Sequence, residues 1–276
     1  PSMHEDDNYD FKMITEYFTE KTVNHFKSQN IKPKVIIANY VLDVLTDVDL
    51  FMKDLVNSID DDGFGVFEIT RFVQFFESFR IDQFAHLRRS WFTVNFLNTL
   101  FKKHNLNLVN IELNKEYRGG TYRVTVSKTG IPCPNLKSFL QEELVVLNTD
   151  YFTSFREKLA RLKSSSLSYI QEKKASGQKI YGYGGGLKAS TLINWLGLTD
   201  NDMESTIDAD EFKVGKYVPV SNIPIMNLQT IKNKKVDVIL LALDHEKEIM
   251  NNLMSTLATG SKVIKLLPSL SESIVQ

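Results

Sequence analysis

Residues 180–194 read IYGYGGGLKASTLIN and place four glycines within five positions, shortly before Lys188. A strand that runs through such a loop into a helix presents backbone N–H groups to an anion. Gly182 permits a tight turn, Gly184 lets a ligand approach the backbone, and Lys188 can reach a phosphate. The spacing therefore indicates a diphosphate site. The alternative is a turn that only packs helix on strand, with Lys188 in solvent.

The loop fits neither of two common phosphate-binding motifs. Leu187 stands where G-x-G-x-x-G requires its third glycine, and the residue order of a P-loop is absent. An NAD-dependent enzyme is therefore a weaker interpretation. Its one candidate for the acidic residue expected about 20 positions after the loop is Asp208.

The composition limits the class of protein. The chain has 276 residues, enough for one large or two modest domains, and 33 Lys+Arg against 34 Asp+Glu give a net charge of −1. This balance disfavours a nucleic-acid partner, and no apolar run approaches the roughly 20 residues of a membrane span. One cysteine, Cys133, excludes cysteine-rich zinc sites, so we expect no metal. We expect a cytoplasmic protein.

Apolar runs alternate with helical patterns, which is typical of α/β domains with parallel sheets. Prolines 132 and 134 mark a boundary, which predicts domains at residues 1–130 and 179–276 joined by a linker and long helix over 131–178. Phe72, Phe75, Phe76 and Phe79, at helical spacing, are expected in the core. Helices are predicted over residues 10–29, 46–58, 92–104, 151–174, 187–196 and 245–258. Buried strands are predicted from residue 34 and over 65–69 and 235–243, and further strands over 106–113, 121–127, 179–183, 205–208 and 260–268.

The second half resembles the sugar C-methyltransferases, which use S-adenosylmethionine to methylate a carbon of a keto-sugar attached to a nucleoside diphosphate. Residues 182–194 are similar to the family signature G-Y-G-A-P-A-K-G-N-T-L-L-N, which ends at Asn194. Residues 208–225 resemble D-x-x-x-x-K-x-G-x-x-x-P-x-x-x-I-P-V. Residues 235–243 and 260–268 resemble the last two strands of the family.

The first half is similar to the same family. Residues 35–42 resemble I-V-A-N-N-V-L, residues 61–69 resemble P-D-G-x-x-V-F-E-V, and residues 118–123 resemble H-G-G-S-L-R. The resemblance implies an α/β fold with a partial Rossmann-like methyltransferase sheet followed by a second Rossmann-like domain. It implies nucleotide-sugar binding by Gly120, Arg123, Gly182, Gly184, Lys188 and Asn194, and cofactor binding by Asn39 and Tyr40.

Part of the family pattern is not found. In the family, a zinc module and the glycine-rich loop that grips S-adenosylmethionine precede the matching part. The resemblance thus implies S-adenosylmethionine as cofactor, but we expect this chain alone not to bind it. We also expect the first sheet to lack its opening strands, leaving an exposed or repaired edge. A missing N-terminal segment or a second subunit would complete it.

The catalytic run of the family, F-D-x-x-Y-H-E-H-x-x-Y-F-S, aligns with residues 81–93. Ala85 replaces the tyrosine, Leu87 the glutamate and Arg88 the second histidine. Arginine is always protonated and is a poor base. His86 is the remaining candidate for a general base, because histidine titrates near working pH. In the aligned register, however, its counterpart is only a neighbour of the catalytic residues.

The leading hypothesis is a C-methyltransferase-like protein in which this chain binds the nucleotide-sugar, or another diphosphate ligand, between its domains. The alternative is a catalytically degenerate homologue that serves as a binding or scaffold subunit. The three catalytic substitutions favour the alternative, whereas the signature at residues 182–194 favours ligand binding under both.

Overall fold

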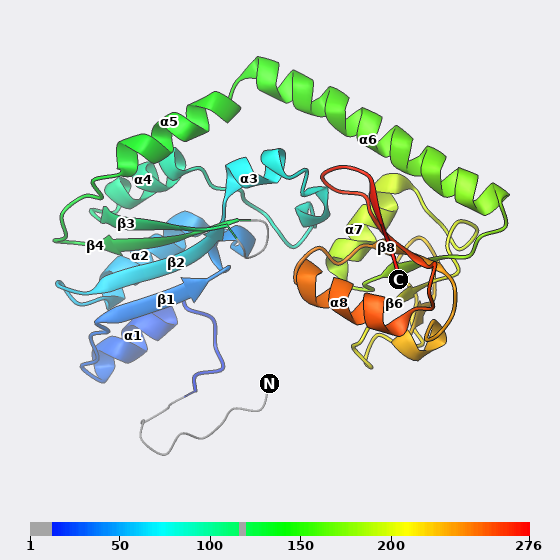
Figure 1. Ribbon diagram of the computed structural model, residues 1–276. Coiled ribbons are helices and arrows are strands. Elements are labelled where there is room, and N and C mark those ends of the chain that lie inside the picture. Colours follow the sequence, from blue (N-terminus) through cyan, green and yellow to red (C-terminus); the bar gives the residue numbers. More distant parts are fainter. Residues whose placement is uncertain (1–12, 116–119) are drawn as a thin grey trace.

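The computed structural model describes residues 13–115 and 120–276, which form two α/β domains bridged by one long helix (Figure 1). No described helix is long and apolar enough to cross a membrane. The first domain and the bridge contain, in chain order, α1 (Glu20–Ser28), β1 (Val35–Asn39), η1 (Leu42–Val44), α2 (Val48–Ser58), β2 (Phe64–Thr70), α3 (Phe72–Glu77), η2 (Ile81–Gln83), α4 (Val94–Lys103), β3 (Asn107–Asn114), β4 (Thr121–Ser127), α5 (Leu136–Val146) and α6 (Thr149–Ala175). The second domain contains β5 (Ile180–Tyr183), α7 (Leu187–Leu196), β6 (Ser205–Ile207), β7 (Ile225–Met226), η3 (Leu228–Thr230), β8 (Asp237–Leu240), α8 (Glu246–Thr256), β9 (Lys262–Lys265) and β10 (Ser271–Ile274).

The first sheet has four strands in the order β1-β2-β4-β3, with β1 parallel to β2 and the other neighbours antiparallel. One face of this sheet packs against apolar side chains of α2, α4 and α5, which include Phe51, Leu97 and Phe139. The buried Cys133 belongs to the same core, as expected of an inert thiol.

The opposite face of the first sheet remains uncovered over β1 and β2. Side chains there alternate with the buried ones, so Val35, Ile37 and Phe64 are 52%, 66% and 43% exposed. No described strand pairs with the outer edge of β1 (Figure 1). The prediction that β1 is a buried strand is therefore wrong, because the strand lies at the edge and is covered on one face.

The second sheet has the order β10-β9-β8-β5-β6-β7, parallel throughout except for β10. Counting its parallel strands along the chain from β5 gives the doubly wound order 3-2-1-4-5, with its topological switch between β5 and β8. Ligands of such sheets bind at the carboxyl ends of the strands on either side of this switch. The glycine loop lies at that point, since it leaves β5 and enters α7.

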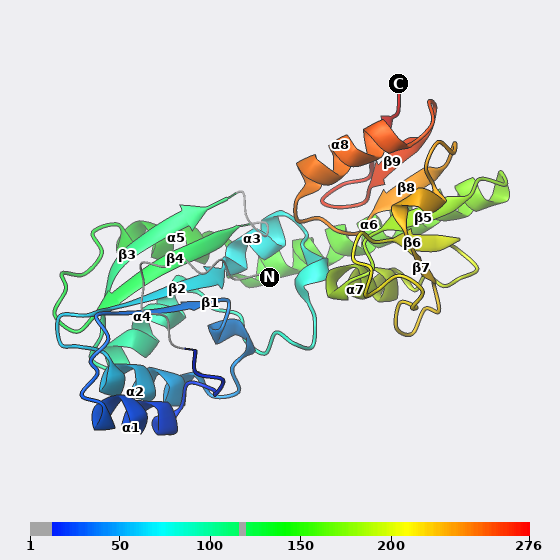
Figure 2. The ribbon, with the colours of Figure 1, turned by 90° about the horizontal axis from the view of Figure 1, so that it is seen from below.

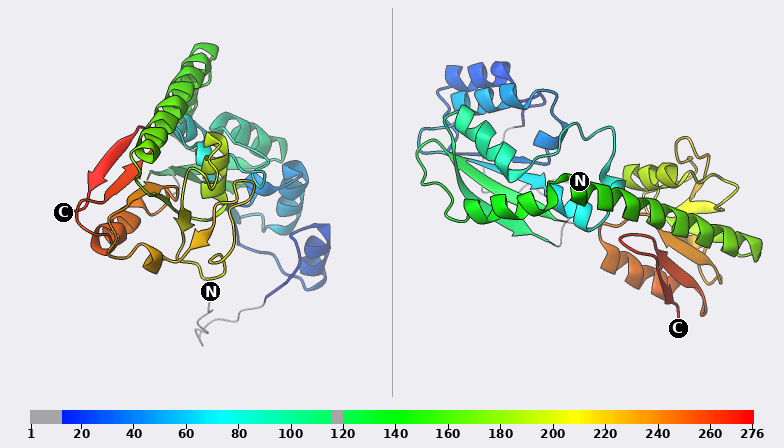
Figure 3. Two further views of the ribbon diagram at one scale, coloured as in Figure 1. Left: turned by 90° about the vertical axis from the view of Figure 1, so that its right-hand side faces the viewer. Right: turned by 90° about the horizontal axis from the view of Figure 1, so that it is seen from above.

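The two domains share one apolar core, so their interface is packed rather than open. Phe75, Phe76 and Ile81, from α3 and η2, lie in one cluster with Leu192 of α7 and with α6 (Figure 2). The predicted core positions Phe75 and Phe76 are thus confirmed, and Phe72 and Phe79 pack against the same cluster. Figure 3 shows α6 running along both domains.

Most predicted elements are confirmed, with two differences besides that at β1. The first helix begins at Glu20 instead of near residue 10, because Thr19 and Thr22 form a capping box there. Helix α5 and the short strands β7 and β10 were not predicted. The predicted connection between β3 and β4 falls partly on residues 116–119, which lie outside the described residues.

Candidate functional site

The glycines of the 182–186 loop lie against the protein itself. A Cβ on Gly182 would come within 2.5 Å of Leu241, and one on Gly184 within 2.9 Å of the Ala242 Cβ. Gly184 also has a φ of +113°, which side chains rarely adopt. Gly184 therefore permits close approach of the chain that leaves β8, where the sequence analysis placed a ligand.

An internal carboxylate already accepts from one N–H group of the loop. The Gly185 N–H donates to Asp208 Oδ2 over 2.8 Å, and Lys213 Nζ lies 3.2 Å from the same oxygen. Burial raises the pKa of Asp208, but the N–H groups of Asp210 and Gly185 together with Lys213 outweigh burial and lower it overall. Asp208 is thus held as an anion beside the start of α7.

Lys188 joins an ion-pair chain that crosses between the domains. Its ammonium group donates to Asp244 Oδ2, and Asp244 Oδ1 accepts from Arg80 of the first domain over 2.9 Å. Arg80 also makes a two-pronged pair with the fully buried Asp82, with both distances 2.8 Å. Burial raises the pKa of Asp244, yet Lys188 and Arg80 lower it overall, while burial is the main cause of the lowered pKa of Lys188.

Three cavities surround this chain of charges. A cavity of about 150 Å³ touches Asp82 and Lys188. A second, of about 360 Å³, lies at the carboxyl ends of β5, β6 and β8 and is lined by Gly184, Asp208 and Asp244. The largest, of about 660 Å³, is lined by Arg80 and Asp244 and lies at the carboxyl ends of β8 and β9. The ion-pair chain therefore lies at the centre of the interdomain region.

The smallest cavity brings together positions that are far apart in the sequence. Leu187 and Lys188, at the start of α7, face the segment aligned with the catalytic run of the family. Its remaining lining residues are Tyr40, Asp43, Val44, Asp82, Gln83, Ala85, Leu87 and Arg88. All three substituted catalytic positions thus line one cavity, whereas the side chain of His86 is exposed and does not line it.

The guanidinium group of Arg88 makes polar and aromatic contacts within the protein. Its guanidinium lies 3.4 Å from Asp43 Oδ2, donates to Gln83 Oε1 over 3.2 Å, and stacks 4.6 Å from the centroid of the Trp91 ring. A permanently charged, stacked side chain therefore lines this cavity at Arg88, and it takes up no proton.

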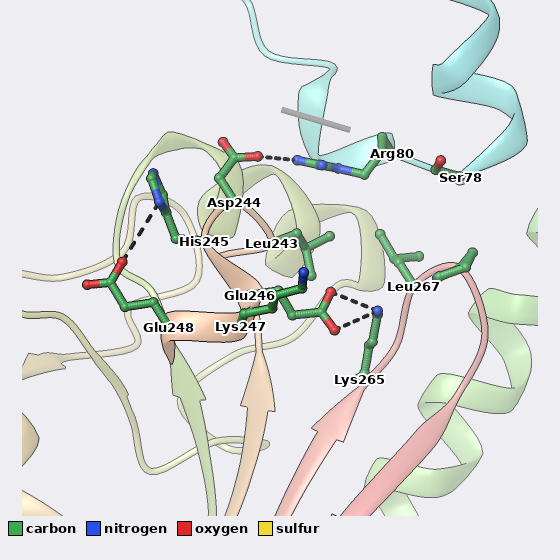
Figure 4. A pocket seen from close by; sticks show the side chains of 11 residues that line it. Ser78, Arg80, Leu243, Asp244, His245, Glu246, Lys247, Glu248, Lys265 and Leu267 are labelled. Carbon is green, nitrogen blue, oxygen red and sulfur yellow. Dashed lines mark hydrogen bonds and ion pairs between the residues drawn. The ribbon is translucent and has the colours of Figure 1, made fainter. Parts of the chain in front are cut away.

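The largest cavity combines three cations and three carboxylates (Figure 4). Lys265 is paired with Glu246 at 2.7 Å, and Arg80 with Asp244. His245 begins α8 with a left-handed backbone, φ 62°, which is uncommon for a residue other than glycine. A volume of about 660 Å³ lies within the range of sites for small molecules and cofactors.

The other predicted binding residues lie apart from Lys188. Asn194 is exposed in the last turn of α7, and its side chain is 3.5 Å from Ser190 Oγ. Gly120, with φ 124°, packs on Gln74. Arg123 is 55% exposed and donates to Glu68 Oε1 over 2.6 Å, on the uncovered face of the first sheet.

The predicted cofactor residues lie at the carboxyl end of β1. Asn39 ends the strand and is exposed, while Tyr40 lines the 150 Å³ cavity. Of the glycines described in the first domain, Gly63, Gly65 and Gly130 lie at the opposite end, where β2 begins and β4 ends, and Gly120 is packed on Gln74. The described residues therefore form no glycine-rich cradle for S-adenosylmethionine beside Tyr40.

Sequence reasoning missed Arg80 and Asp244. Asp244 follows the apolar run of β8, and side chains at the carboxyl end of a parallel strand are placed to meet a ligand. Its position was thus a usable signal. Nothing in the local sequence indicated that Arg80, 164 residues earlier, would be its partner.

The sequence of the chain is similar to sequences of known proteins. Residues 116–268 match the model of the C-methyltransferase C-terminal domain. The chain is 24% identical over 230 residues to C-methyltransferase NovU of Streptomyces niveus, a match that covers 81% of this chain and 54% of the relative. The chain thus spans about half the length of this curated relative.

Comparison with solved structures gives no further support for a function. Two structures of Haemonchus contortus phosphoethanolamine N-methyltransferase 2, one with S-adenosyl-L-methionine and one with phosphomonomethylethanolamine and S-adenosylhomocysteine, are 11% and 12% identical. They cover 85% and 88% of this chain, and the matches cover 60% and 62% of their own chains. Both TM-scores are 0.24, too low to support an argument.

Proposed function

The chain belongs to the C-methyltransferase family, and from that premise we propose that it binds the methyl acceptor, a nucleotide-linked keto-sugar, between its two domains. The observation that carries the proposal is the shared lining of the 150 Å³ cavity. The segment aligned with the catalytic run and the start of α7, about 100 residues apart in sequence, meet there. A functional cleft accounts for this convergence directly.

The two larger cavities extend the space available to a nucleotide. A volume of about 150 Å³ is below the roughly 300–1,000 Å³ typical of ligand pockets, whereas the neighbouring cavities of about 360 and 660 Å³ are within it. Arg80 and Lys188 are the cations at the centre of this region. We assign them to the diphosphate. Its oxygens would replace the Asp244 carboxylate as the acceptor of hydrogen bonds from both cations.

The chain itself supplies binding and not proton transfer in this proposal. C-methylation of a keto-sugar begins with removal of a proton next to the keto group, which requires a base. Ala85, Leu87 and Arg88 cannot act as one, and the carboxylates lining the cavity, Asp43 and Asp82, are paired with Arg88 and Arg80.

The methyl donor of the complete protein is S-adenosylmethionine in this proposal, by family membership. It would supply an electrophilic methyl group, and Asn39 and Tyr40 are the residues of this chain that we assign to it by the resemblance. Because the described residues form no cradle for it, a further segment or subunit would bind it. The open edge of β1 and the exposed Val35 and Ile37 support docking of that part there.

The second candidate is a degenerate homologue that acts as a binding or scaffold subunit in the cytoplasm. The contacts of Arg88 with Asp43 and Trp91 favour this candidate, as does the ion pair between Lys188 and Asp244. The two candidates differ in what this chain alone should bind. Only the first requires affinity for a nucleotide-sugar.

Calorimetric titration of the chain with UDP-glucose and dTDP-glucose tests the proposal. We expect binding that weakens about tenfold or more in Lys188→Ala, since a charge-assisted contact is worth about 1.5–3 kcal/mol. Lys179→Ala is the matched control, because Lys179 is 65% exposed and pairs with Glu204 away from the cavities. Absence of binding, or equal affinity of Lys188→Ala and the unmodified chain, would favour the scaffold candidate.

A further inference from the structure

A groove of about 410 Å³ lies outside the site described above, between α6, the turn after α3 and the loop that joins β9 to β10. Figure 1 shows this red loop beneath α6. The groove is lined by Phe79, Lys158, Arg161, Leu162, Ser165, Pro268, Ser269 and Leu270. Pro268 also lines the 660 Å³ cavity, so the two spaces adjoin.

The charges in this groove are of one sign. Lys158 and Arg161 lie three residues apart on α6, hence on the same face, and both are exposed. Neither makes an ion pair with a carboxylate of the part of the chain that the structure describes. By contrast, Arg80, Lys188 and Lys265 in the interdomain cavities are paired, and of the cations there only Lys247 makes no ion pair with the described residues.

The rest of the lining fits a ligand that is partly polar and partly apolar. The hydroxyl of Ser269 can donate to an anion, while that of Ser165 donates to the Leu162 carbonyl over 3.0 Å, and Leu162 and Leu270 form an apolar wall. The Phe79 ring stacks on Phe155 with centroids 5.1 Å apart, which fixes that side of the groove.

The backbone conformation of Phe79 also supports a functional role for this groove. Its φ is +50°, a left-handed conformation that is rare for a bulky residue. Such conformations persist where surrounding packing enforces them, and they concentrate at functional sites. Here the conformation places an aromatic ring at the wall of a groove that has two cations on its other side.

We propose that this groove is an anion site for a phosphate monoester with an apolar or aromatic body, held by Lys158 and Arg161 and covered by Phe79 and Leu270. The phosphate accepts from the two cations and the Ser269 hydroxyl, and the apolar body lies on the wall. This site goes beyond the acceptor site between the domains and does not involve Lys188.

Titrations with phenyl phosphate, inorganic phosphate and benzoate test the inference. We expect phenyl phosphate to bind more tightly than the other two, because it alone combines a dianion with a ring. The double variant Lys158→Ala/Arg161→Ala should lose at least tenfold in affinity. The control Lys137→Ala/Arg156→Ala removes the same charge from exposed positions of α5 and α6 that do not line the groove, and should change affinity less than twofold.

Two outcomes overturn the inference. Either phenyl phosphate does not bind the unmodified chain, or both double variants reduce the affinity for phenyl phosphate equally, which would reflect net charge alone. Its failure is distinguishable from failure of the proposed function. UDP-glucose binding should survive in Lys158→Ala/Arg161→Ala and weaken in Lys188→Ala, whereas phenyl phosphate binding should show the reverse pattern.

Discussion

The carboxylate of Asp244 joins the two domains, accepting from Arg80 of the first over 2.9 Å and from Lys188 of the second. Asp244 is 23% exposed and Arg80 only 9%, so the contact is largely shielded from solvent. The lysine of the glycine-loop signature therefore has a structural partner in the protein before any ligand arrives.

Asp244→Asn should destabilise the protein by about 3 kcal/mol, since removing one partner of a buried ion pair leaves charge uncompensated. Urea unfolding measures the change. Glu204→Gln is the control, because its pair with Lys179 is exposed and contributes less than about 1 kcal/mol. Equal effects of the two substitutions would show that the interdomain pair adds no more than a surface contact.

Gly184→Ala should cost about 2 kcal/mol or more in unfolding free energy, because its φ of +113° and the nearby Ala242 both oppose a side chain. Gly197→Ala is the matched control, with φ +77° and no atom near the new Cβ. It measures the conformational cost alone. If thermal and urea unfolding show the two variants to be equally stable, then Gly184 is not needed for packing against Ala242.

The lowered pKa of Asp208 predicts a pH-dependent contribution to stability. A carboxylate whose pKa falls below its ordinary value of 3.8 on folding stabilises the protein above that value, and the contribution is lost as pH falls through the folded pKa. The difference in unfolding free energy between the unmodified chain and Asp208→Asn should thus be constant from about pH 7 to 5 and shrink below pH 4. A difference that grows on acidification would contradict this.

Much of the architecture could be predicted because local patterns carry it. The buried runs of β5 and β8 and the caps of α2 and α4 are sequence features. Helix α5 was missed because hydrophobicity does not follow its buried face. That face holds Leu136, Phe139, Leu140 and Val146 but also the buried Glu143, whereas Leu144 and Val145 are both 70% exposed.

The site was harder to predict than the fold. The spacing of the glycines predicted that a ligand approaches the backbone at Gly184, whereas the atoms that lie there belong to Ala242. Likewise, Asp208 stands out in the sequence as an acidic residue after the loop, but its hydrogen bond from the Gly185 N–H could not be predicted. Contacts between residues far apart in sequence depend on the tertiary fold, which local sequence patterns do not reveal.

Ile37→Lys should leave the unfolding free energy within about 0.5 kcal/mol of the unmodified chain, since Ile37 is 66% exposed. It should also reduce self-association, because a charge on an open edge strand opposes pairing with another strand. Light scattering against protein concentration measures this. Loss of folding in Ile37→Lys would mean that the β1 face is packed in solution.

The central claim is that a nucleotide-sugar binds between the domains, and amide chemical-shift mapping with UDP-glucose or dTDP-glucose tests it most directly. The account predicts that shifts concentrate together in residues 40–44, 81–88, 187–188 and 243–248, which line the interdomain cavities. Shifts confined to other surfaces, or none at saturating ligand, would contradict it.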